Sequence, residues 1–348
     1  MAVARVKTWV IGDELTQTDL NAEFNNVLDN GTAMAFPLDR NVEAAGFDLT
    51  EIDEVAFATT AATVASAIGR LRRNGANITW HDGTGGQSLM LLGSNYIGGL
   101  ELSDVIGTTQ LNDITIATGV ATDTTNSTLL RLTAALNKRV DEAWVVGGST
   151  GGLDTGAVNL TTAVITYHVH LIKRPDTGVV DALFSTSPNA PVMPTNYTLR
   201  RRIGSMLYTT TLGFAEFTQM EDRFYLNTEV TDVTATTSET TTVITRTLRV
   251  PTGINVLAEG IMRVIASTGG AAAVLITDPN ETDQTPAAGT GFSTIVVHQD
   301  AVSFGTHFQC RTNTSAQIRT RRNTTGTGES ITISTRGWVD VRGRNGGL

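Results

Sequence analysis

Short runs of alternating apolar and polar residues, separated by turn-forming residues, constrain this 348-residue chain more than any other feature. Across Thr162–Lys173, successive residues alternate between two faces, as they do in a β-strand. Asp176-Thr177-Gly178 predicts a hairpin turn, and residues 179–184 predict the returning strand. Turn residues then recur about every 8–12 residues, a spacing typical of a β-sandwich. We therefore predict a mainly β protein.

Strands are predicted along most of the chain from residue 77 onward. Before the hairpin they are expected at 77–81, 88–92 and 114–118. The later strands are numerous enough for a jelly-roll-like β-sandwich, or for two sandwiches divided near 225–240. These later strands are expected at 199–210, 224–234, 241–250, 255–266, 272–277, 292–299, 304–310, 315–321 and 330–341.

The composition fits this fold and argues against several partners. Hydrophobic residues make up 40% of the chain and charged residues 17%, so a packed core is expected. The abundant threonine is β-branched and suits a half-exposed sheet surface. The net charge of −9 argues against nucleic acid or an anionic membrane as the partner.

Several kinds of site are not expected in this sequence. Cys310 is the only cysteine, so neither an intrachain disulfide nor a cysteine-based zinc site is expected. No apolar run reaches the roughly 18 residues of a membrane-spanning helix, so no membrane insertion is expected. The first residues carry Arg5 and Lys7 without an apolar segment, which predicts no secretory signal and assembly in a cytoplasm. No phosphate-binding, hydrolase or metalloprotease motif predicts a cofactor or a catalytic residue.

Residues 14–29 predict one short amphipathic helix. Thr16 or Thr18 is the expected N-cap, and Asp19 places a carboxylate in the first turn. The narrow apolar stripe of this helix needs a partner, which suggests that residues 1–37 dock onto another protein. The candidate docking residues are Leu20, Phe24, Val27 and Leu28.

Residues 38–120 predict a thin stem. Between residues 38 and 75 the larger apolar residues are sparse and are separated by Gly, Asp and Glu. So few apolar side chains cannot form a core within one chain, which predicts that three copies intertwine as a homotrimer. The distal region, 121–348, is then the β-sandwich part.

Two segments resemble tail-fibre proteins of bacteriophages and prophages. Lys7–Val10, Gly12–Thr16 and Asp19–Asn25 look like the N-terminal entry segment of tail-fibre and tail-appendage subunits. Gly69–Gly75 and Trp80–Gly83 are similar to a short strand unit of fibre shafts. This resemblance implies a virion part with an N-terminal attachment end.

A third stretch resembles a β-rich domain of tail-fibre-like proteins from tailed phages and prophages. Its motifs imply a virion part, on the tail or on the head, and imply no catalytic residue. Residues 225–348 are interpreted from their physical pattern alone. The segments that carry the resemblance are Gly151–Gly156, Tyr167–Val169, Thr177–Asp181, Leu183–Ser187, Pro194–Tyr197 and Arg201–Ser205.

His168 and His170 lie on one face of the strand predicted at Thr162–Lys173. In a trimer, their rings could gather around a metal ion on the axis. Ordinary hydrogen bonds within the sheet are the favoured alternative, because a metal site also needs supporting partners that a sequence does not reveal.

Cleavage of a glycan would need two carboxylates that face a sugar. Glu221 and Asp222 are the closest pair, but neighbours on a strand point to opposite faces. Aromatic residues could stack on sugars, although core packing is the favoured role for most of them. These aromatic residues are Tyr197, Tyr208, Phe214, Phe217, Phe224 and Tyr225.

Two groups of arginines are prominent in the second half of the chain. Arg200-Arg201-Arg202 lacks flanking aromatic residues, so it does not predict nucleic-acid binding. The later group predicts solvated strand edges, with an anion-binding patch as the sharper alternative. It comprises Arg311, Arg319, Arg321, Arg322, Arg336, Arg342 and Arg344.

These patterns lead to one expected function and two alternatives. We expect a phage tail fibre or spike in the virion, docked to other virion proteins through its N-terminus and binding a host surface glycan or protein through its β region. The first alternative is a head fibre, collar spike or capsid decoration with a mechanical role. The second is a polysaccharide depolymerase.

Overall fold

The structure, a computed structural model, is mainly β, with 56% strand and 3% helix, so the predicted fold class is confirmed. It divides into two compact units, Met1–Met90 and Leu91–Leu348. The described residues are 14, 16–22, 70–74, 77–81, 87–88, 95–104, 112–155, 164–209, 213–234, 240–265, 272–287, 293–297, 303–323 and 330–344.

The first unit contains the predicted N-terminal helix, which is described over residues 17–22. Thr16 is its N-cap, because the Asp19 amide donates to the Thr16 hydroxyl at 3.2 Å. Leu20, the first candidate docking residue, is 45% exposed. The other three, Phe24, Val27 and Leu28, lie outside the described residues.

A small antiparallel sheet completes the described part of the first unit. It consists of β1 (Arg70–Asn74), β2 (Asn77–His81) and β3 (Gln87–Ser88), in the order β1-β2-β3. The strand predicted at 77–81 is confirmed by β2. The strand predicted at 88–92 overlaps β3 at Ser88, and its remaining residues lie outside the described ranges.

The second unit opens with two sheets. One has eight strands in the order β14-β13-β11-β12-β10-β9-β6-β5, and the other has three in the order β4-β7-β8. The strands are β4 (Ile97–Gly99), β5 (Leu102–Asp104), β6 (Asp113–Ile116), β7 (Gly119–Thr122), β8 (Leu129–Leu132), β9 (Leu136–Ala143), β10 (Thr150–Leu153), β11 (Val164–Lys173), β12 (Val180–Ser185), β13 (Leu199–Thr209) and β14 (Gly213–Phe214).

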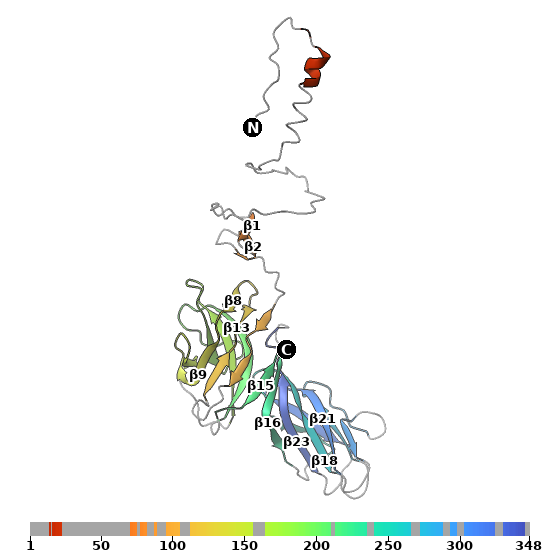
Figure 1. The fold of residues 1–348 in the computed structure, drawn as a ribbon. Coiled ribbons are helices and arrows are strands. Elements are labelled where there is room, and N and C mark those ends of the chain that lie inside the picture. The colour runs from red at the N-terminus through yellow and green to blue at the C-terminus, as the bar shows by residue number, and fades with distance from the viewer. Residues whose placement is uncertain are drawn as a thin grey trace. The chain divides into compact units, whose positions relative to one another are not determined.

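Two more sheets follow in the same unit (Figure 1). One has the order β15-β16-β23-β18-β21, and the other has the order β17-β22-β19-β20. The strands are β15 (Phe217–Met220), β16 (Arg223–Val233), β17 (Ile244–Thr247), β18 (Leu257–Ile265), β19 (Ala272–Thr277), β20 (Ile295–Val297), β21 (Ser303–Arg311), β22 (Gln317–Arg322) and β23 (Ser330–Val339).

The predicted hairpin joins β11 to β12. The Arg174 amide donates to the Val179 carbonyl at 2.9 Å, and the Gly178 amide donates to the Arg174 carbonyl at 2.8 Å. Gly178 has a φ of 76°, a left-handed conformation that glycine adopts without a steric cost. The hairpin prediction is therefore confirmed. All the strands predicted after it also overlap observed strands.

The strand predicted at 114–118 overlaps β6, whereas the short strands β4, β5, β7, β14 and β15 and the strands β8, β9 and β10 were not predicted. Residues 129–136 contain enough apolar side chains to hide the boundary between β8 and β9. β10 pairs in parallel with both β9 and β12, although most other strand pairs are antiparallel. Parallel strands are not joined by a tight hairpin turn, so no hairpin signal marks β10. Its Gly151-Gly152 pair is itself an ordinary loop signal, which conceals the strand.

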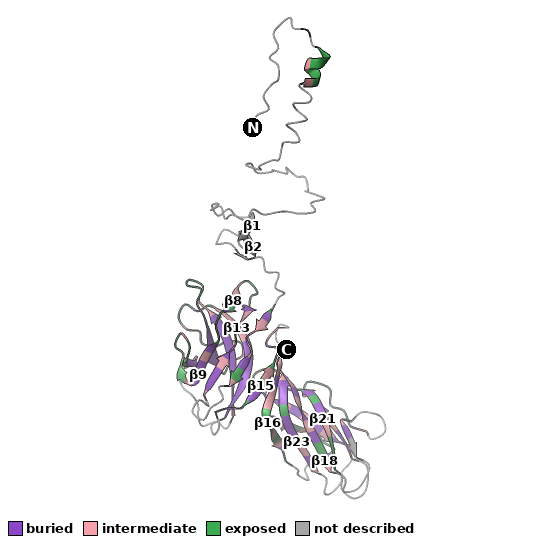
Figure 2. Ribbon diagram, in the orientation of Figure 1, coloured by how far each residue is buried: buried purple, intermediate pink, exposed green. Residues whose placement is uncertain are grey.

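The core of the second unit includes residues that the sequence analysis assigned to the stem. Ile97, Leu102 and Ile114 belong to the buried cluster that continues through β11 and β18. The compact unit begins at Leu91, whereas the stem was expected to extend to residue 120. Figure 2 shows the buried residues following the strands of this unit.

The five-stranded sheet has one buried face and one accessible face. Along β18, Ala258, Met262 and Val264 are buried, and Glu259 and Arg263 alternate with them on the other face. The buried face shares its core with β19, β20 and β22, as in a two-sheet sandwich. The jelly-roll order stays a prediction. The accessible face carries the first candidate site.

Candidate functional site

A row of residues crosses four strands on the accessible face of the five-stranded sheet. Tyr225 on β16 is opposite Gly337 on β23, Gly337 is opposite Glu259 on β18, and Glu259 is opposite Gln309 on β21. Because Gly337 has no side chain, β23 places nothing between the Tyr225 ring and the Glu259 carboxylate, and the Arg223 guanidinium reaches both. A Cβ at position 337 would lie 2.1 Å from the Phe224 carbonyl oxygen, so only glycine fits there.

This row forms a groove with a volume of about 640 Å³, which we call the sheet groove. Its remaining polar lining comes from His307 and Arg336, which are both exposed. Leu226, Gly260 and Phe308 complete the lining. The groove therefore combines the Tyr225 ring and the buried Phe308 ring with four polar or charged side chains that neighbouring strands hold in place.

Hydrogen bonds fix the polar side chains of the sheet groove. Arg223 forms an ion pair with Glu259 at 3.0 Å, and its Nη1 donates to the Tyr225 hydroxyl at 3.1 Å. The Gln309 amide donates to the Glu259 carboxylate at 2.7 Å. The Arg223 guanidinium also lies 5.8 Å from the Tyr225 ring centre. The groove is thus ordered before any ligand binds, which lowers the entropic cost of binding.

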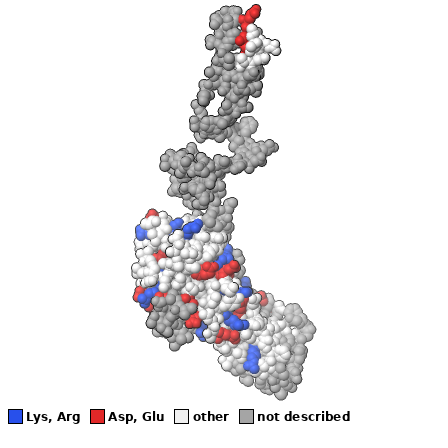
Figure 3. Space-filling model, viewed as in Figure 1, with Lys and Arg blue, Asp and Glu red and all other residues white. Residues whose placement is uncertain are grey.

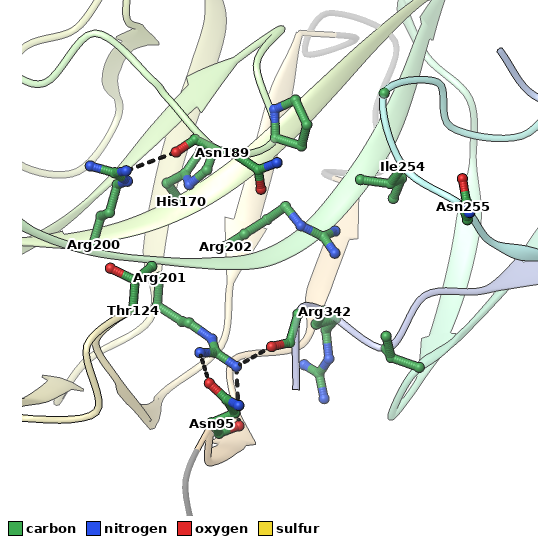
Figure 4. A pocket seen from close by; sticks show the side chains of 14 residues that line it. Asn95, Thr124, His170, Asn189, Arg200, Arg201, Arg202, Ile254, Asn255 and Arg342 are labelled. Atoms are coloured by element: carbon green, nitrogen blue, oxygen red, sulfur yellow. Dashed lines mark hydrogen bonds between the residues drawn. The ribbon is translucent and has the colours of Figure 1, made fainter. Parts of the chain in front are cut away.

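A second hollow, which we call the arginine pocket, has a volume of about 270 Å³. Four of its described lining residues are arginines, and none is Asp or Glu. Figure 4 shows Arg202 pointing toward the side on which Ile254 and Asn255 lie, and Arg200 bonded to Asn189 on the other side. The lining residues are Asn95, Thr124, His170, Pro188, Asn189, Arg200, Arg201, Arg202, Gly253, Ile254, Asn255, Val341, Arg342 and Gly343.

The chain that follows β23 brings two of these arginines together with their carboxylate partners. Arg202 Nη2 donates to Asp340 Oδ1 at 2.9 Å. Arg342 Nε donates to Asp222 Oδ1 at 2.8 Å. Asp340 is fully buried; burial opposes its ionisation, but the Arg202 guanidinium outweighs this and lowers the Asp340 pKa. These two ion pairs tie residues 340–342 to β13 and to the turn before β16.

Arg201 is buried without a carboxylate partner among the described residues. Its Nη1 donates to Asn95 Oδ1 at 2.9 Å, and its Nη2 donates to the carbonyls of Asn95 at 3.1 Å and Gly343 at 2.9 Å. The side chain is only 3% exposed. Burial, followed by the neighbouring cations led by Arg202, lowers the Arg201 pKa. A buried guanidinium that is held by neutral oxygens alone is electrostatically undercompensated.

A contrasting buried cation lies in the eight-stranded sheet. Lys138 on β9 is 0% exposed and forms an ion pair with Asp181 at 3.1 Å. Its ammonium also donates to the carbonyls of Val145 and Gly147 and to the Thr150 hydroxyl, at 2.6, 3.0 and 3.0 Å. Burial lowers the Lys138 pKa. Every donor of this ammonium is occupied, so this cluster is structural.

His168, Ser205 and Asp340 meet beside the arginine pocket, but not in the order of a catalytic triad. The Ser205 hydroxyl lies between the other two, 2.8 Å from His168 Nδ1 and 3.3 Å from Asp340 Oδ2. All three residues are buried, and Asp340 is already paired with Arg202. This order leaves no base to activate an exposed hydroxyl, so the trio is a structural network.

Both histidines singled out from the sequence are buried within the single chain. His168 is 0% and His170 is 1% exposed. His170 Nε2 donates to the Ser187 carbonyl at 3.1 Å. Burial, assisted by the Arg202 guanidinium, lowers the pKa of both rings to about 3. Neither ring is accessible to other copies of the chain, which favours ordinary hydrogen bonds over the proposed metal ion on a trimer axis.

Most of the aromatic residues considered for sugar stacking are in the core instead. Tyr197, Tyr208, Phe214, Phe217 and Phe224 are all buried, and Phe224 stacks on Trp338. Only the sixth candidate, Tyr225, contributes to an accessible surface, in the sheet groove. The acidic neighbours lie in a turn and not on a strand as expected: Glu221 is exposed, and Asp222 pairs with Arg342 and Arg344.

The later arginines do not form one patch. Several bind the carboxylates or carbonyls of neighbouring loops, and acidic and basic side chains are interspersed on the face of the β unit that Figure 3 shows. Only Arg342 lines the arginine pocket. Recorded partners are Asp278 for Arg311, the Asp278 and Glu281 carbonyls for Arg319, Asp283 for Arg321, Glu229 for Arg336, and Asp222 for Arg344.

No protein-family model matches this chain, and no curated protein is significantly similar to it. Within the described residues, no three His, Cys, Asp or Glu side chains gather as a metal site would require. The described helical residues also include no helix long and apolar enough to cross a membrane.

Proposed function

We propose that this chain is a subunit of a bacteriophage virion, a trimeric tail fibre or spike that binds a glycan of the host surface. Residues 1–37 attach it to other virion proteins, and the unit Leu91–Leu348 contacts the host. The virion is its place of action, after assembly in the host cytoplasm. It acts by binding and not by catalysis.

The observation that carries this proposal is the sheet groove. A sugar has an apolar C–H face that stacks on an aromatic ring and hydroxyls that bond to planar polar side chains. Tyr225 supplies such a ring, and Glu259, Gln309 and Arg336 supply such side chains. All four belong to strands of a single sheet, so their spacing is fixed before binding.

The groove also disfavours glycan cleavage. Glu259 is the only carboxylate among its described lining residues. Arg223 and Gln309 already bind that carboxylate. Glycoside hydrolysis usually requires two carboxyl groups that face the sugar, one of them free to donate a proton. The resemblance of Gly151–Gly156 and Arg201–Ser205 to tail-fibre-like proteins supports the assignment to a phage tail fibre or spike.

Competition with infection tests the proposal directly. Purified full-length protein is added to host cells before phage, and adsorption of the phage is measured. Tyr225→Ala removes the stacking ring and should reduce competition about fivefold or more, taking the roughly 1–3 kcal/mol by which aromatic side chains hold stacked nucleobases as the scale. Phe304→Ala is the matched control, since Phe304 is a 53% exposed aromatic residue on β21 outside the groove.

The outcomes separate the alternatives. Competition by the wild type and by Phe304→Ala, but not by Tyr225→Ala, supports the proposal. Release of oligosaccharides from host polysaccharide would indicate a depolymerase. No effect at saturating concentration would indicate a head fibre, collar spike or capsid decoration.

Two further measurements test the assembly. Light scattering should give the mass of a trimer, and a stable monomer would contradict that part of the proposal. Deletion of residues 1–37 should abolish incorporation into particles; normal incorporation would show that attachment lies elsewhere.

A further inference from the structure

The arginine pocket has more positive charge than its partners neutralise. Of its four arginines, Arg202 is paired with Asp340 and Arg342 with Asp222. Arg200 and Arg201 have no carboxylate within ion-pair distance among the described residues, although Asp123 acts on Arg201 from farther away. The pocket therefore attracts an anion, and guanidinium groups bind carboxylates and phosphates through paired hydrogen bonds.

Unsatisfied polar atoms around the pocket include both donors and acceptors. Among the described residues, Arg201 Nε and Arg342 Nη1 are buried donors that have no acceptor. Asn255 Oδ1 and His170 Nδ1 are buried there without a donor. Because His170 donates through Nε2 to Ser187, its Nδ1 is an acceptor. Leaving such atoms unpaired is costly, and a ligand or small shifts of the walls toward it would relieve that cost.

The remaining walls fit the body of a sugar. Pro188, Ile254 and Val341 offer apolar contact, and Asn95 and Asn189 offer amide groups. The volume of about 270 Å³ holds on the order of nine waters at about 30 Å³ each, which is comparable to one hexose ring with its substituents. An inorganic ion alone would leave most of this space and the apolar wall unused.

We infer that the arginine pocket is a binding site for the anionic group of an acidic saccharide, a sugar that bears a carboxylate or a phosphate. Arg200 holds the anionic group in the positive field of Arg201, while Asn255 and His170 accept from the sugar hydroxyls. The inference rests on the proposed function, to which it adds a second binding site with a different ligand preference from the sheet groove.

Ligand-observed saturation-transfer NMR on the full-length protein tests this inference. The probes are D-glucuronate, D-glucose 6-phosphate and D-glucose, which differ only at the sixth carbon. Glucuronate or glucose 6-phosphate should bind at least tenfold more tightly than glucose. Binding should weaken when NaCl is raised, because salt screens the attraction between partly exposed charges.

Two variants localise the binding. Arg200→Gln removes the half-buried cation whose recorded hydrogen bond is to the Asn189 carbonyl, and should weaken glucuronate binding at least tenfold without loss of fold. Ile254→Glu places a carboxylate beside the arginines and should abolish binding. Arg263→Gln makes the same charge change as the first variant on exposed β18, outside the pocket, and should leave binding unchanged.

The results have distinct meanings. Equal signals from glucose and glucuronate, or unchanged binding by folded Arg200→Gln, would overturn the anionic site. Preference for glucuronate over glucose 6-phosphate identifies a carboxylate as the ligand group, and the reverse preference identifies a phosphate. If neither anion binds while the wild type still competes with phage, the pocket assignment fails but the proposed host-binding function stands.

Discussion

The sheet groove and the arginine pocket lie in the same β unit, but they are constructed differently. The groove is a product of strand register: Tyr225, Glu259 and Gln309 fall in one row on an accessible sheet face. The pocket forms where the end of the chain returns: Asp340 bonds to Arg202 on β13, and Arg342 bonds to Asp222 before β16, each more than a hundred residues away in sequence. Arg201, Asp340 and Arg342 of the pocket are buried, whereas the groove residues His307, Gln309 and Arg336 are exposed.

This difference implies different sensitivities. A groove on a sheet face can lose a side chain without disturbing the fold beneath it. The arginine pocket cannot, because its ion pairs also hold the final segment of the chain in place. Changes to the ion-paired residues of the pocket should therefore affect stability first and binding second, and changes at the groove should do the reverse.

The largest effect on stability is expected from Asp340→Ala. This change leaves the Arg202 guanidinium without its carboxylate and removes the acceptor of the Arg342 amide. Loss of one partner of a buried ion pair typically costs about 3–5 kcal/mol in free energy of unfolding. Denaturant unfolding followed by fluorescence measures this cost, and Trp338 near the end of β23 is a suitable probe.

Asp176→Ala is the control for this prediction. It breaks the exposed Arg174–Asp176 pair, which should contribute little because water screens it. Equal stabilities for Asp340→Ala and Asp176→Ala would show that the pocket is not held by its ion pairs, and the contrast with the groove would disappear.

The second effect is a loss of stability in mild acid. His168 and His170 have a pKa of about 3 in the folded chain, against 6.5 when unfolded. As the pH falls below 6.5, the unfolded chain gains protons that the folded chain does not bind, so the free energy of unfolding decreases. At pH 5 the expected loss is about 2 kcal/mol for each histidine.

Urea unfolding at pH 7.5 and pH 5.0 measures this loss. His170→Asn should reduce the difference between the two pH values by about half, because one of the two titrating rings is gone. A difference that is unchanged in the variant would assign the acid sensitivity to other groups.

A third, smaller effect is expected where a glycine supports the pocket wall. Gly253 has a φ of 83°, and an added Cβ would lie 3.2 Å from His168 Nε2. Gly253→Ala should cost about 1–2 kcal/mol from backbone strain, with an additional cost from crowding. Gly178→Ala isolates the strain, because Gly178 has a φ of 76° with no atom within 4 Å of its Cβ. Similar losses of stability in the two variants would show that the contact between the added Cβ and His168 has no measurable cost in free energy of unfolding.

The sequence predicted the strands well where alternation and turn residues coincide. β11 and β12 with their hairpin, and most strands of the second half, follow from local pattern alone. β8, β9 and β10 escaped prediction because the run at 129–136 is apolar throughout most of its length and β10 pairs in parallel. The place of Ile97, Leu102 and Ile114 in the core escaped prediction because their packing partners are distant in sequence.

The two sites were predictable to different degrees. Tyr225 was among the candidate sugar-stacking residues. Alternation along β16 puts its side chain on the other face of the sheet from the buried Phe224. Its neighbours in the row depend on the register between strands. Bulges at Tyr225/Val230 and Glu259/Gly260 shift this register, and the local sequence does not specify the size of the shift. The arginine pocket brings Arg200–Arg202 together with Arg342. These residues belong to two basic clusters that are far apart in sequence, and no local pattern indicates that the clusters meet.

The smallest effect on stability is expected for Arg336→Gln in the sheet groove. Arg336 is 52% exposed, and its 3.6 Å pair with Glu229 is also exposed. Such a pair contributes about 0–1 kcal/mol, so the unfolding midpoint should hardly move. Because the guanidinium lines the groove, competition with phage should still weaken severalfold. For Arg200→Gln, by contrast, the loss of glucuronate affinity relative to the wild type should grow as the salt concentration is lowered, because the variant lacks an uncompensated charge. If Arg336→Gln instead destabilised the protein and left competition unchanged, the accessible sheet face would be a structural contact, such as one between copies of the chain, and the groove would have to be abandoned as the host-binding site.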